Sequence, residues 1–150
     1  MIAWQVAQLN VGHLHHPVDH PATADFTNNL DTINAVAEAA PGFVGRLQGE
    51  NGNATGYGRD GDPLRILNLS VWESIEALRD FTYDERHRHF LRRRGEWFRP
   101  PDGPHLVLWW VPAGHRPTIE EAEDRLARLS FEGPGPTVFT FARPQAPPAG

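Results

Sequence analysis

The order in which strand-like and helix-like patterns follow one another constrains the fold of this chain most. Short apolar or alternating runs predict strands, and apolar residues three and four positions apart predict helices. The expected strands cover residues 4–11, 43–48, 64–72 and 105–111. The expected helices cover residues 26–37, one or two stretches between 75 and 98, and 118–132. A further short edge strand is expected at 137–141.

Capping and breaking residues mark the helix boundaries. Ser74 is the expected N-cap of the second helical region, and Thr118 opens the last helix in a capping box with Glu121. The helical pattern between 75 and 98 is either one helix or two helices with a break near Tyr83. Proline- and glycine-containing stretches that end the helices lie at 41–42, 100–104 and 133–136.

The resulting order is β-α-β-β-α-β, followed by an added C-terminal helix and strand. This is the split βαβ, or ferredoxin-like, arrangement, so the expected class is α+β. A length of 150 residues suits one domain with a proper core. We expect a single domain over residues 1–143 and a flexible, proline-rich tail over 144–150.

Two of the expected strands, 64–72 and 105–111, are apolar on both faces. Trp109 and Trp110 must point to opposite sides of the sheet, because successive side chains alternate. Helices can cover one face of an antiparallel sheet, but the other face is normally polar. The second cover is either the sheet of another subunit, which is the simpler arrangement, or the C-terminal helix of the same chain. The pattern therefore predicts a homodimer.

Missing residue types narrow the possible chemistry. All 14 basic residues are Arg, and the chain contains neither Lys nor Cys. Without Lys there is no Schiff base to hold a pyridoxal cofactor. Without Cys there is no thiolate nucleophile, disulfide, iron–sulfur cluster or thiolate-ligated haem. The net charge of −5 argues against a general nucleic-acid binder, so we expect a small-molecule substrate and no nucleic acid as partner.

Targeting signals are not visible in the sequence. The N-terminal residues lack the charged segment and the long apolar run of a signal peptide. The longest apolar run, residues 106–113, is far too short to span a bilayer. We therefore expect a cytoplasmic protein with no membrane partner.

Several motifs resemble known families. Residues 70–74 and 77–81 look like the third strand and second helix of dimeric α+β barrel proteins. That superfamily includes cofactor-independent antibiotic-biosynthesis monooxygenases and haem-binding chlorite dismutase-like enzymes. A closer match is family 3291 of the domains of unknown function (DUF3291). The residues that carry this resemblance are 8–12, 70–74, Tyr83 with His87, 92–98 and 108–118. The likeness covers about residues 3 to 143 and implies a dimeric α+β barrel while leaving the activity open.

The main candidate for chemistry is a helical stripe in the second half of the chain. Tyr83, His87, Leu91 and Arg94 recur at spacings of four and three and share one helix face. In the resembled fold such a face looks across a cavity toward the sheet. His87 could act there as a general base, and Arg94 could stabilise an enolate or bind a carboxylate. The alternative is a solvated or structurally bonded histidine on a basic helix.

A second set of candidates would bind the substrate. Buried polar groups need partners, which a ligand or a nearby loop can supply. The polar residues that interrupt apolar strands are Gln8, Asn10, Arg46, Asn68 and Ser70. The aromatic residues that could line a pocket for a flat substrate are Trp72, Phe90, Trp97 and one of Trp109 and Trp110, of which we choose Trp109.

Two further motifs have ordinary interpretations. The loop with His13, His15, His16, Asp19 and His20 is rich in imidazoles, but its spacing is no recognised ligand pattern, so we expect no metal site. Residues 56–61 match G-x-G-x-x-G letter by letter, but a strand and not a helix is expected after them. We therefore interpret them as a loop and not as a dinucleotide-binding fingerprint.

These observations together predict a small-molecule enzyme of secondary metabolism that acts on an aromatic or enolisable substrate between sheet and helices. His87 would take a proton, and Arg94, Arg46 or Asn68 would stabilise the anion. The reaction would be that of a monooxygenase, cyclase or isomerase without a bound cofactor. Two alternatives stay open: a haem enzyme with His87 as axial ligand, and a non-catalytic dimer that binds a ligand.

Overall fold

A four-stranded antiparallel sheet organises the chain, with strand order β2-β3-β1-β4. The structure, a computed structural model, describes residues 3–47 and 62–149. The strands are β1 (Trp4–His13), β2 (Phe43–Arg46), β3 (Arg65–Trp72) and β4 (Leu106–Pro112). The helices are α1 (Ala24–Ala39), α2 (Ile75–Thr82), α3 (Glu85–Arg92), α4 (Arg94–Trp97) and α5 (Ile119–Glu132), with a 3-10 turn at Pro21–Thr23. The order confirms the expected ferredoxin-like α+β class.

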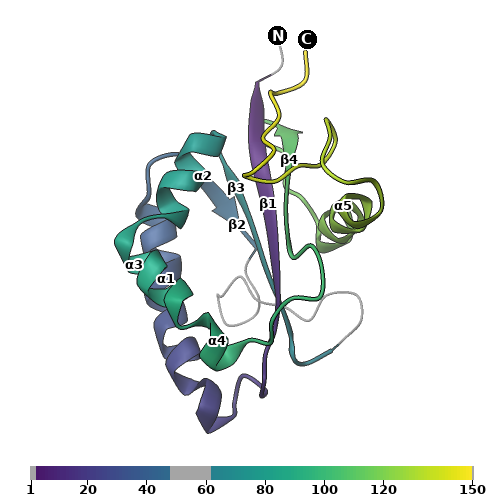
Figure 1. Cartoon of the computed structure of the whole chain (residues 1–150). Coiled ribbons are helices and arrows are strands. Elements are labelled where there is room, and N and C mark those ends of the chain that lie inside the picture. The colour runs from purple at the N-terminus through teal and green to yellow at the C-terminus, as the bar shows by residue number, and fades with distance from the viewer. Residues whose placement is uncertain (1–2, 48–61, 150) are drawn as a thin grey trace.

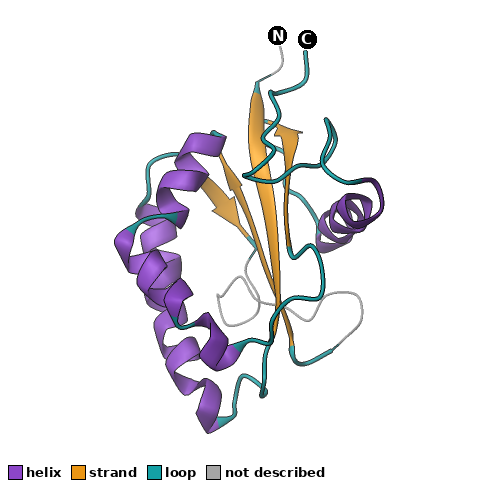
Figure 2. Ribbon diagram, viewed as in Figure 1, coloured by secondary structure: helices purple, strands orange, loops and turns teal. Residues whose placement is uncertain are grey.

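The helices form two layers, one on each face of the sheet. In Figure 1, α1 to α4 lie on one side of the sheet, and α5 lies alone on the other side. Figure 2 shows the same three-layer arrangement by secondary structure. None of the helices in the described part of the chain is long and apolar enough to cross a membrane.

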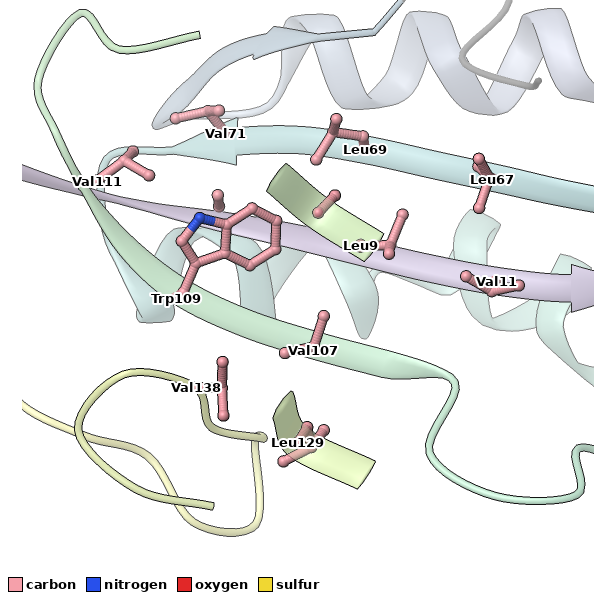
Figure 3. Close-up of a cluster of buried hydrophobic side chains, with 12 residues drawn as sticks. Leu9, Val11, Leu67, Leu69, Val71, Val107, Trp109, Val111, Leu129 and Val138 are labelled. Carbon is pink, nitrogen blue, oxygen red and sulfur yellow. The ribbon is translucent and has the colours of Figure 1, made fainter. Parts of the chain in front are cut away.

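The outer face of the sheet is mostly apolar and is covered by α5. Its buried residues include Leu9, Leu69 and Trp109 on the strands and Leu129 on α5 (Figure 3). Ala122 of α5 belongs to the same cluster. The sequence left two possible covers for this face, a partner sheet or the C-terminal helix of the same chain. In the structure the C-terminal helix covers it. The argument from two-sided apolar strands therefore no longer requires a partner subunit.

The inner face of the sheet carries polar residues along its middle. The register pairs Gln8 with Ser70 and Asn10 with Asn68, so these four side chains share one face. A bulge between Phe43 and Gly45 shifts β2 by one residue. The register of β2 then pairs Arg46 with Ser70.

Apolar clusters join the inner face to the helices at its two ends. One cluster gathers Trp72, Leu78 and Phe139, and the other gathers Leu14, Phe26 and Trp97. Because β1 runs from Trp4 to His13, the first cluster lies near its start and the second near its end. The polar middle of the sheet lies between them, and this is where the candidate site is found.

The helix boundaries follow the capping residues. The Ser74 hydroxyl accepts a hydrogen bond from the Ala77 N–H at 3.0 Å, and the Thr118 hydroxyl accepts one from the Glu121 N–H at 3.0 Å. Of the two alternatives for the helical region after Ser74, the structure has the break at Tyr83, and it has a second break at Arg93 that was not predicted. Each break starts a new helix direction, so three short helices replace one long one.

The C-terminal segment returns to the sheet without forming the expected strand at 137–141. Phe139 and Leu108 exchange two backbone hydrogen bonds of 2.9 Å, which is an isolated bridge. Farther along, the Trp110 indole N–H donates to the Gln145 carbonyl at 3.0 Å. The proline at position 136 and the short turn at 140–143 interrupt a longer ladder.

Candidate functional site

A cavity of about 330 Å³ lies between the inner face of the sheet and helices α1 to α4. Its lining is mostly aromatic and aliphatic, with a few polar groups, as is usual for small-molecule sites. The polar and charged residues that line it are Gln8, Asn10, Asn34, Arg46, Asn68, Ser70, Thr82, Tyr83, His87, Arg94 and His105. The aromatic residues that line it are Phe26, Phe43, Trp72, Phe81, Phe90, Phe98 and Phe141.

A hydrogen-bonded group of side chains forms the floor of the cavity on β1 and β3. The Gln8 amide donates to Asn68 Oδ1 at 2.7 Å and to Ser70 Oγ at 2.8 Å. The Trp72 indole N–H also donates to Ser70 Oγ, at 2.9 Å. Since Ser70 Oγ accepts two hydrogen bonds, its own hydroxyl proton can point to a ligand. Asn10 lines the cavity next to this group.

Arg46 adds an incompletely bonded guanidinium to the cavity wall. Its Nε and Nη2 donate to Glu38 Oε1 at 3.0 and 2.8 Å, and its side chain is only 9% exposed. The remaining nitrogen, Nη1, is buried and has no hydrogen-bond partner within the described structure. A buried donor without a partner is costly, and an oxygen of a bound molecule would satisfy it.

The break between α2 and α3 positions the His87 ring. In a continuous helix the Arg86 N–H would donate to the Thr82 carbonyl, but here it donates to Asp84 Oδ1 at 2.9 Å. The Thr82 carbonyl instead accepts from His87 Nδ1 at 2.9 Å. A carbonyl can only accept, so Nδ1 carries the proton and Nε2 keeps its lone pair.

Burial keeps His87 neutral near pH 7. The ring packs 4.7 Å from the ring of Phe81. Desolvation lowers the pKa of His87 below its ordinary value of 6.5, and the Thr82 carbonyl and the Asp84 carboxylate only partly oppose this. A neutral imidazole with a free Nε2 at the edge of an apolar cavity is suited to accept a proton.

Arg94 and His105 lie at the end of the cavity farthest along β1. Burial lowers the pKa of His105, and the positive charge of Arg94 lowers it further. The Gly103 carbonyl, which accepts a hydrogen bond from His105, acts in the opposite direction. Tyr83 also lines the cavity but is 58% exposed, which places it at the rim.

The structure brings together most of the residues that the sequence singled out. His87, Arg94 and Tyr83, proposed for catalysis, all line the cavity. The proposed binding residues that line it are Asn10, Arg46, Asn68, Trp72 and Phe90. Their roles stay predictions, but their proximity follows from the sheet register and the arrangement of α2 to α4.

Trp97 and Trp109 do not line the cavity, which corrects their expected place. Trp97 is buried below it, where it packs on Phe26 and Phe90 and lies 4.8 Å from the Arg93 guanidinium. Trp109 belongs to the outer face, where its indole N–H donates to Glu121 at 2.9 Å. Alternation along β4 excludes Trp109 from the inner face, because its neighbour Trp110 already occupies that face.

Phe81, His105 and Phe141 line the cavity but were not among the predicted site residues. Phe81 carried a usable signal, since it lies one helical turn from other apolar residues of α2. In the sequence, His105 stands at the start of the expected strand 105–111, and no role in the site was predicted for it. Phe141 comes from the C-terminal segment, and no sequence pattern could have predicted that this segment returns to the cavity.

The histidine-rich loop has structural contacts. The rings of His16 and His20 stack 4.2 Å apart, and His20 Nδ1 accepts from the Ala22 N–H at 3.0 Å. His15 Nε2 lies 3.2 Å from the Gly95 carbonyl. Within residues 3–47 and 62–149, no three potential metal ligands gather in one place. The G-x-G-x-x-G match at 56–61 lies outside the described residues.

Comparison with protein families identifies the chain's relatives by sequence. A family model described as a domain of unknown function (DUF3291) matches residues 5–150. The match therefore spans nearly the whole chain. Comparison with curated proteins gave no match.

Solved structures share the fold at low sequence identity. Rv0793 from Mycobacterium tuberculosis has a TM-score of 0.51 and 14% identity, over 76% of this chain and 99% of its own. SO0527 from Shewanella oneidensis has a TM-score of 0.51 and 11% identity, over 73% of this chain and 91% of its own. A mutant of SnoaB, a cofactor-independent oxygenase from Streptomyces nogalater, has a TM-score of 0.50 and 15% identity, over 75% and 95%. These likenesses concern the fold alone.

Proposed function

The chain belongs to the DUF3291 family, and from the geometry of its cavity we propose that it is a small-molecule enzyme with His87 as general base. The observation that carries the proposal is the hydrogen bond from His87 Nδ1 to the Thr82 carbonyl at 2.9 Å. This bond leaves Nε2 as a proton acceptor in a cavity whose walls are largely apolar. The proposed reaction begins with proton removal from an aromatic or enolisable substrate.

The polar floor would stabilise the anion that forms. Ser70 has a hydroxyl proton available, and Asn68 has an amide group at the cavity wall. Arg46 offers its buried Nη1, which would otherwise lack a partner. Donors of this kind stabilise developing negative charge strongly when water is excluded. The base lies on α3 and the donors lie on the sheet, so a flat molecule between them would contact both.

The size and lining of the cavity favour a flat, mostly apolar substrate. At about 330 Å³ the cavity lies near the small end of the roughly 300–1,000 Å³ typical of small-molecule sites. Rings such as Phe26, Phe90 and Phe98 can pack on the face or edge of an aromatic ligand. Two or three fused rings fit this space.

The deprotonated substrate has three possible fates. Reprotonation at another atom would make the protein an isomerase, and attack on an internal electrophile would make it a cyclase. Reaction with molecular oxygen would make it a monooxygenase. The fold shared with SnoaB, a cofactor-independent oxygenase, supports a reaction that needs no bound cofactor. We propose a biosynthetic role from the resemblance of residues 70–74 and 77–81 to the superfamily that includes antibiotic-biosynthesis monooxygenases.

Deuterium exchange tests the first step without knowledge of the natural substrate. The probe is 2-tetralone, a flat aromatic ketone with acidic C–H bonds, incubated with the protein in D₂O and followed by NMR. We expect protein-catalysed exchange that falls about 10²–10⁴-fold in His87→Gln. The matched control is His89→Gln, an exposed histidine on the same helix, which should leave the exchange unchanged.

The result that would remove His87 from this role is equal exchange in wild type and His87→Gln. Near-UV circular dichroism of each variant checks that the packing is retained. Binding of aromatic ketones without any exchange would favour the third possibility, a non-catalytic ligand-binding protein.

Haem fits this cavity poorly. His87 Nε2 could serve as an axial ligand, because Nδ1 already donates to the Thr82 carbonyl. However, the cavity is near the small end of the usual range, and haem is a four-pyrrole macrocycle with two propionates. Addition of haem to the purified protein tests this point: a Soret band that disappears in His87→Gln would favour the haem alternative.

The homodimer and the cytoplasmic location stay proposals. The outer face of the sheet is covered by α5, so the support for a dimer is now the resemblance to dimeric α+β barrel proteins. Multi-angle light scattering measures the mass directly. A homodimer gives twice the 16.8 kDa of the chain, and a value of 16.8 kDa excludes it under the conditions used.

A further inference from the structure

A second cavity of about 510 Å³ adjoins the first one beyond the end of β1. The two cavities have Gly12, Arg94 and His105 in common, so they are neighbours along the sheet. Gly12 has no side chain, and the ring of Phe98 lies where a side chain would be. The Phe98 ring therefore packs directly on the Gly12 backbone, which lines both cavities.

Positive charge dominates the second cavity, although the chain as a whole has a net charge of −5. Among the described residues, Arg65, Arg94 and Arg99 line it, against a single carboxylate, Asp102. Arg94 and Arg99 make no ion pair with any residue in 3–47 or 62–149. A local excess of cations in a concave site attracts and holds anions.

One terminal nitrogen of the Arg65 guanidinium forms an ion pair, and the other has no hydrogen-bond partner within the described structure. Its Nη2 pairs with Glu123, which neutralises part of its charge. Its Nη1 is buried and has no partner within the described structure. Such a donor is more stable when an oxygen atom reaches it, directly or through water. The unsatisfied Nη1 is therefore a second observation that favours an anionic occupant.

The walls of this cavity are held in place by backbone hydrogen bonds. The Arg99 N–H donates to the His13 carbonyl at 2.8 Å, and the Val11 N–H donates to the His105 carbonyl at 2.8 Å. Three prolines at 100, 101 and 104 restrict the loop between these contacts. A fixed frame reduces the entropy that a bound ligand must otherwise overcome.

We propose that this second cavity, which we term the cationic cleft, binds the anionic group of the substrate while the apolar ring of the same molecule occupies the first cavity. The substrate class is thus an aromatic or enolisable compound with a carboxylate or phosphate. The inference rests on the proposed function for the position of the ring. It depends on Arg94 and Arg99 for recognition of the anion, because planar guanidinium groups match the oxygens of both anions.

Two dyes with the same ring system test the proposal. One is 8-anilinonaphthalene-1-sulfonate, which is anionic, and the other is N-phenyl-1-naphthylamine, which lacks the sulfonate and is neutral. Fluorescence titration gives the Kd of each. We expect Arg99→Gln to weaken binding of the anionic dye about tenfold and to leave the neutral dye unchanged. The control Arg92→Gln, an exposed arginine outside both cavities, should affect neither dye.

Asp102→Asn should change the affinity for the anionic dye in the opposite direction to Arg99→Gln. Removal of this negative charge from the lining of the cleft should tighten binding of the anionic dye and leave binding of the neutral dye unchanged. Added salt should weaken binding of the anionic dye but not of the neutral dye, because ions screen partly exposed charges. Near-UV circular dichroism confirms that each variant keeps its packing.

Competition with 2-naphthoate and 2-naphthyl phosphate distinguishes a carboxylate from a phosphate. Displacement of the anionic dye by inorganic phosphate alone would also support an anion site in the cleft. The proposal would be overturned if Arg99→Gln weakened binding of both dyes equally, or if it weakened binding of neither. His87→Gln separates this inference from the proposed function. This variant should lose deuterium exchange, but it should bind both dyes with unchanged Kd, so the effect of Arg99→Gln on the anionic dye can still be measured in it.

Discussion

His87 illustrates how one side chain acquires a function from its surroundings. The sequence places it on a helical stripe with Tyr83 and Arg94, but the stripe does not specify the protonation state. That state depends on the Thr82 carbonyl, which the helix break leaves without a backbone donor. It also depends on burial, which disfavours the imidazolium.

The first prediction concerns the titration of this ring. The pKa of His87 should lie below 6.5 in the folded protein, as measured by an NMR pH titration of the imidazole signals. The unfolded chain then binds a proton that the folded ring does not, between pH 6.5 and the lower folded-state pKa. The free energy of unfolding should therefore decrease as the pH falls through this window. The decrease should be smaller in His87→Gln, while His105, whose pKa is also lowered, keeps part of it.

Asp84→Asn tests how the neighbouring carboxylate contributes to the pKa of His87. The Asp84 carboxylate raises the pKa of His87, so its replacement should lower that pKa further while an asparagine still caps α3. Glu85→Gln, at an exposed neighbouring position, is the control. A pKa of His87 at or above 6.5 would contradict the burial argument.

At the scale of elements, α5 decides how the sheet is used. It covers the outer face through Ala122, Leu129 and the partly buried Ile119 and Leu126. The first cavity therefore lies on the inner face, between the sheet and α1 to α4. The short lengths of α2, α3 and α4 also matter, because each break directs a different side chain toward the cavity.

The second prediction concerns the start of α5. Thr118→Ala removes the hydroxyl that accepts the Glu121 N–H at 3.0 Å, and should lower the free energy of unfolding by about 1 kcal/mol. Urea denaturation measures this value. Thr118→Ser keeps the cap and should cost much less. An equal loss in both variants would show that packing of the threonine methyl, and not capping, stabilises the helix start.

At the scale of the whole molecule, the cavity results from the separation of two packed ends. The clusters around Trp72 and around Trp97 hold the helix layer on the sheet, and the polar floor lies between them. The C-terminal segment completes the wall with Phe141, although it is distant in sequence from α1 to α4. Arg79 lies 5.7 Å from the Phe141 ring and helps to hold it.

The third prediction tests this contribution of the C-terminal segment. Phe141→Ala should weaken binding of the neutral dye N-phenyl-1-naphthylamine several-fold, because it removes apolar contact area from the first cavity. Fluorescence titration measures the change. Phe131→Ala is the matched control, since Phe131 is 89% exposed on α5 and lies outside both cavities. Equal effects of the two substitutions would contradict the assignment of Phe141 to the cavity wall.

Much of the sheet could be predicted because its signals are local. Side chains alternate along a strand, so the sequence by itself determined that Gln8 and Asn10 share a face. The single helix face expected for His87 and Arg94 was wrong, because the break at Arg93 places these residues on separate helices, α3 and α4. The sequence also determined the order of the four strands and the N-caps at Ser74 and Thr118, whereas the expected strand at 137–141 did not form. These features depend on backbone geometry over a few residues.

Only the tertiary structure decided which layer covers which face and which side chains reach the cavity. Trp109 and Trp97 are as aromatic as Trp72, but the path of the chain buries them elsewhere. The choice of α5 over a partner subunit, and the return of Phe141, depend on contacts between residues far apart in sequence. Such contacts are set by the packing of the whole molecule, for which local periodicity carries no information.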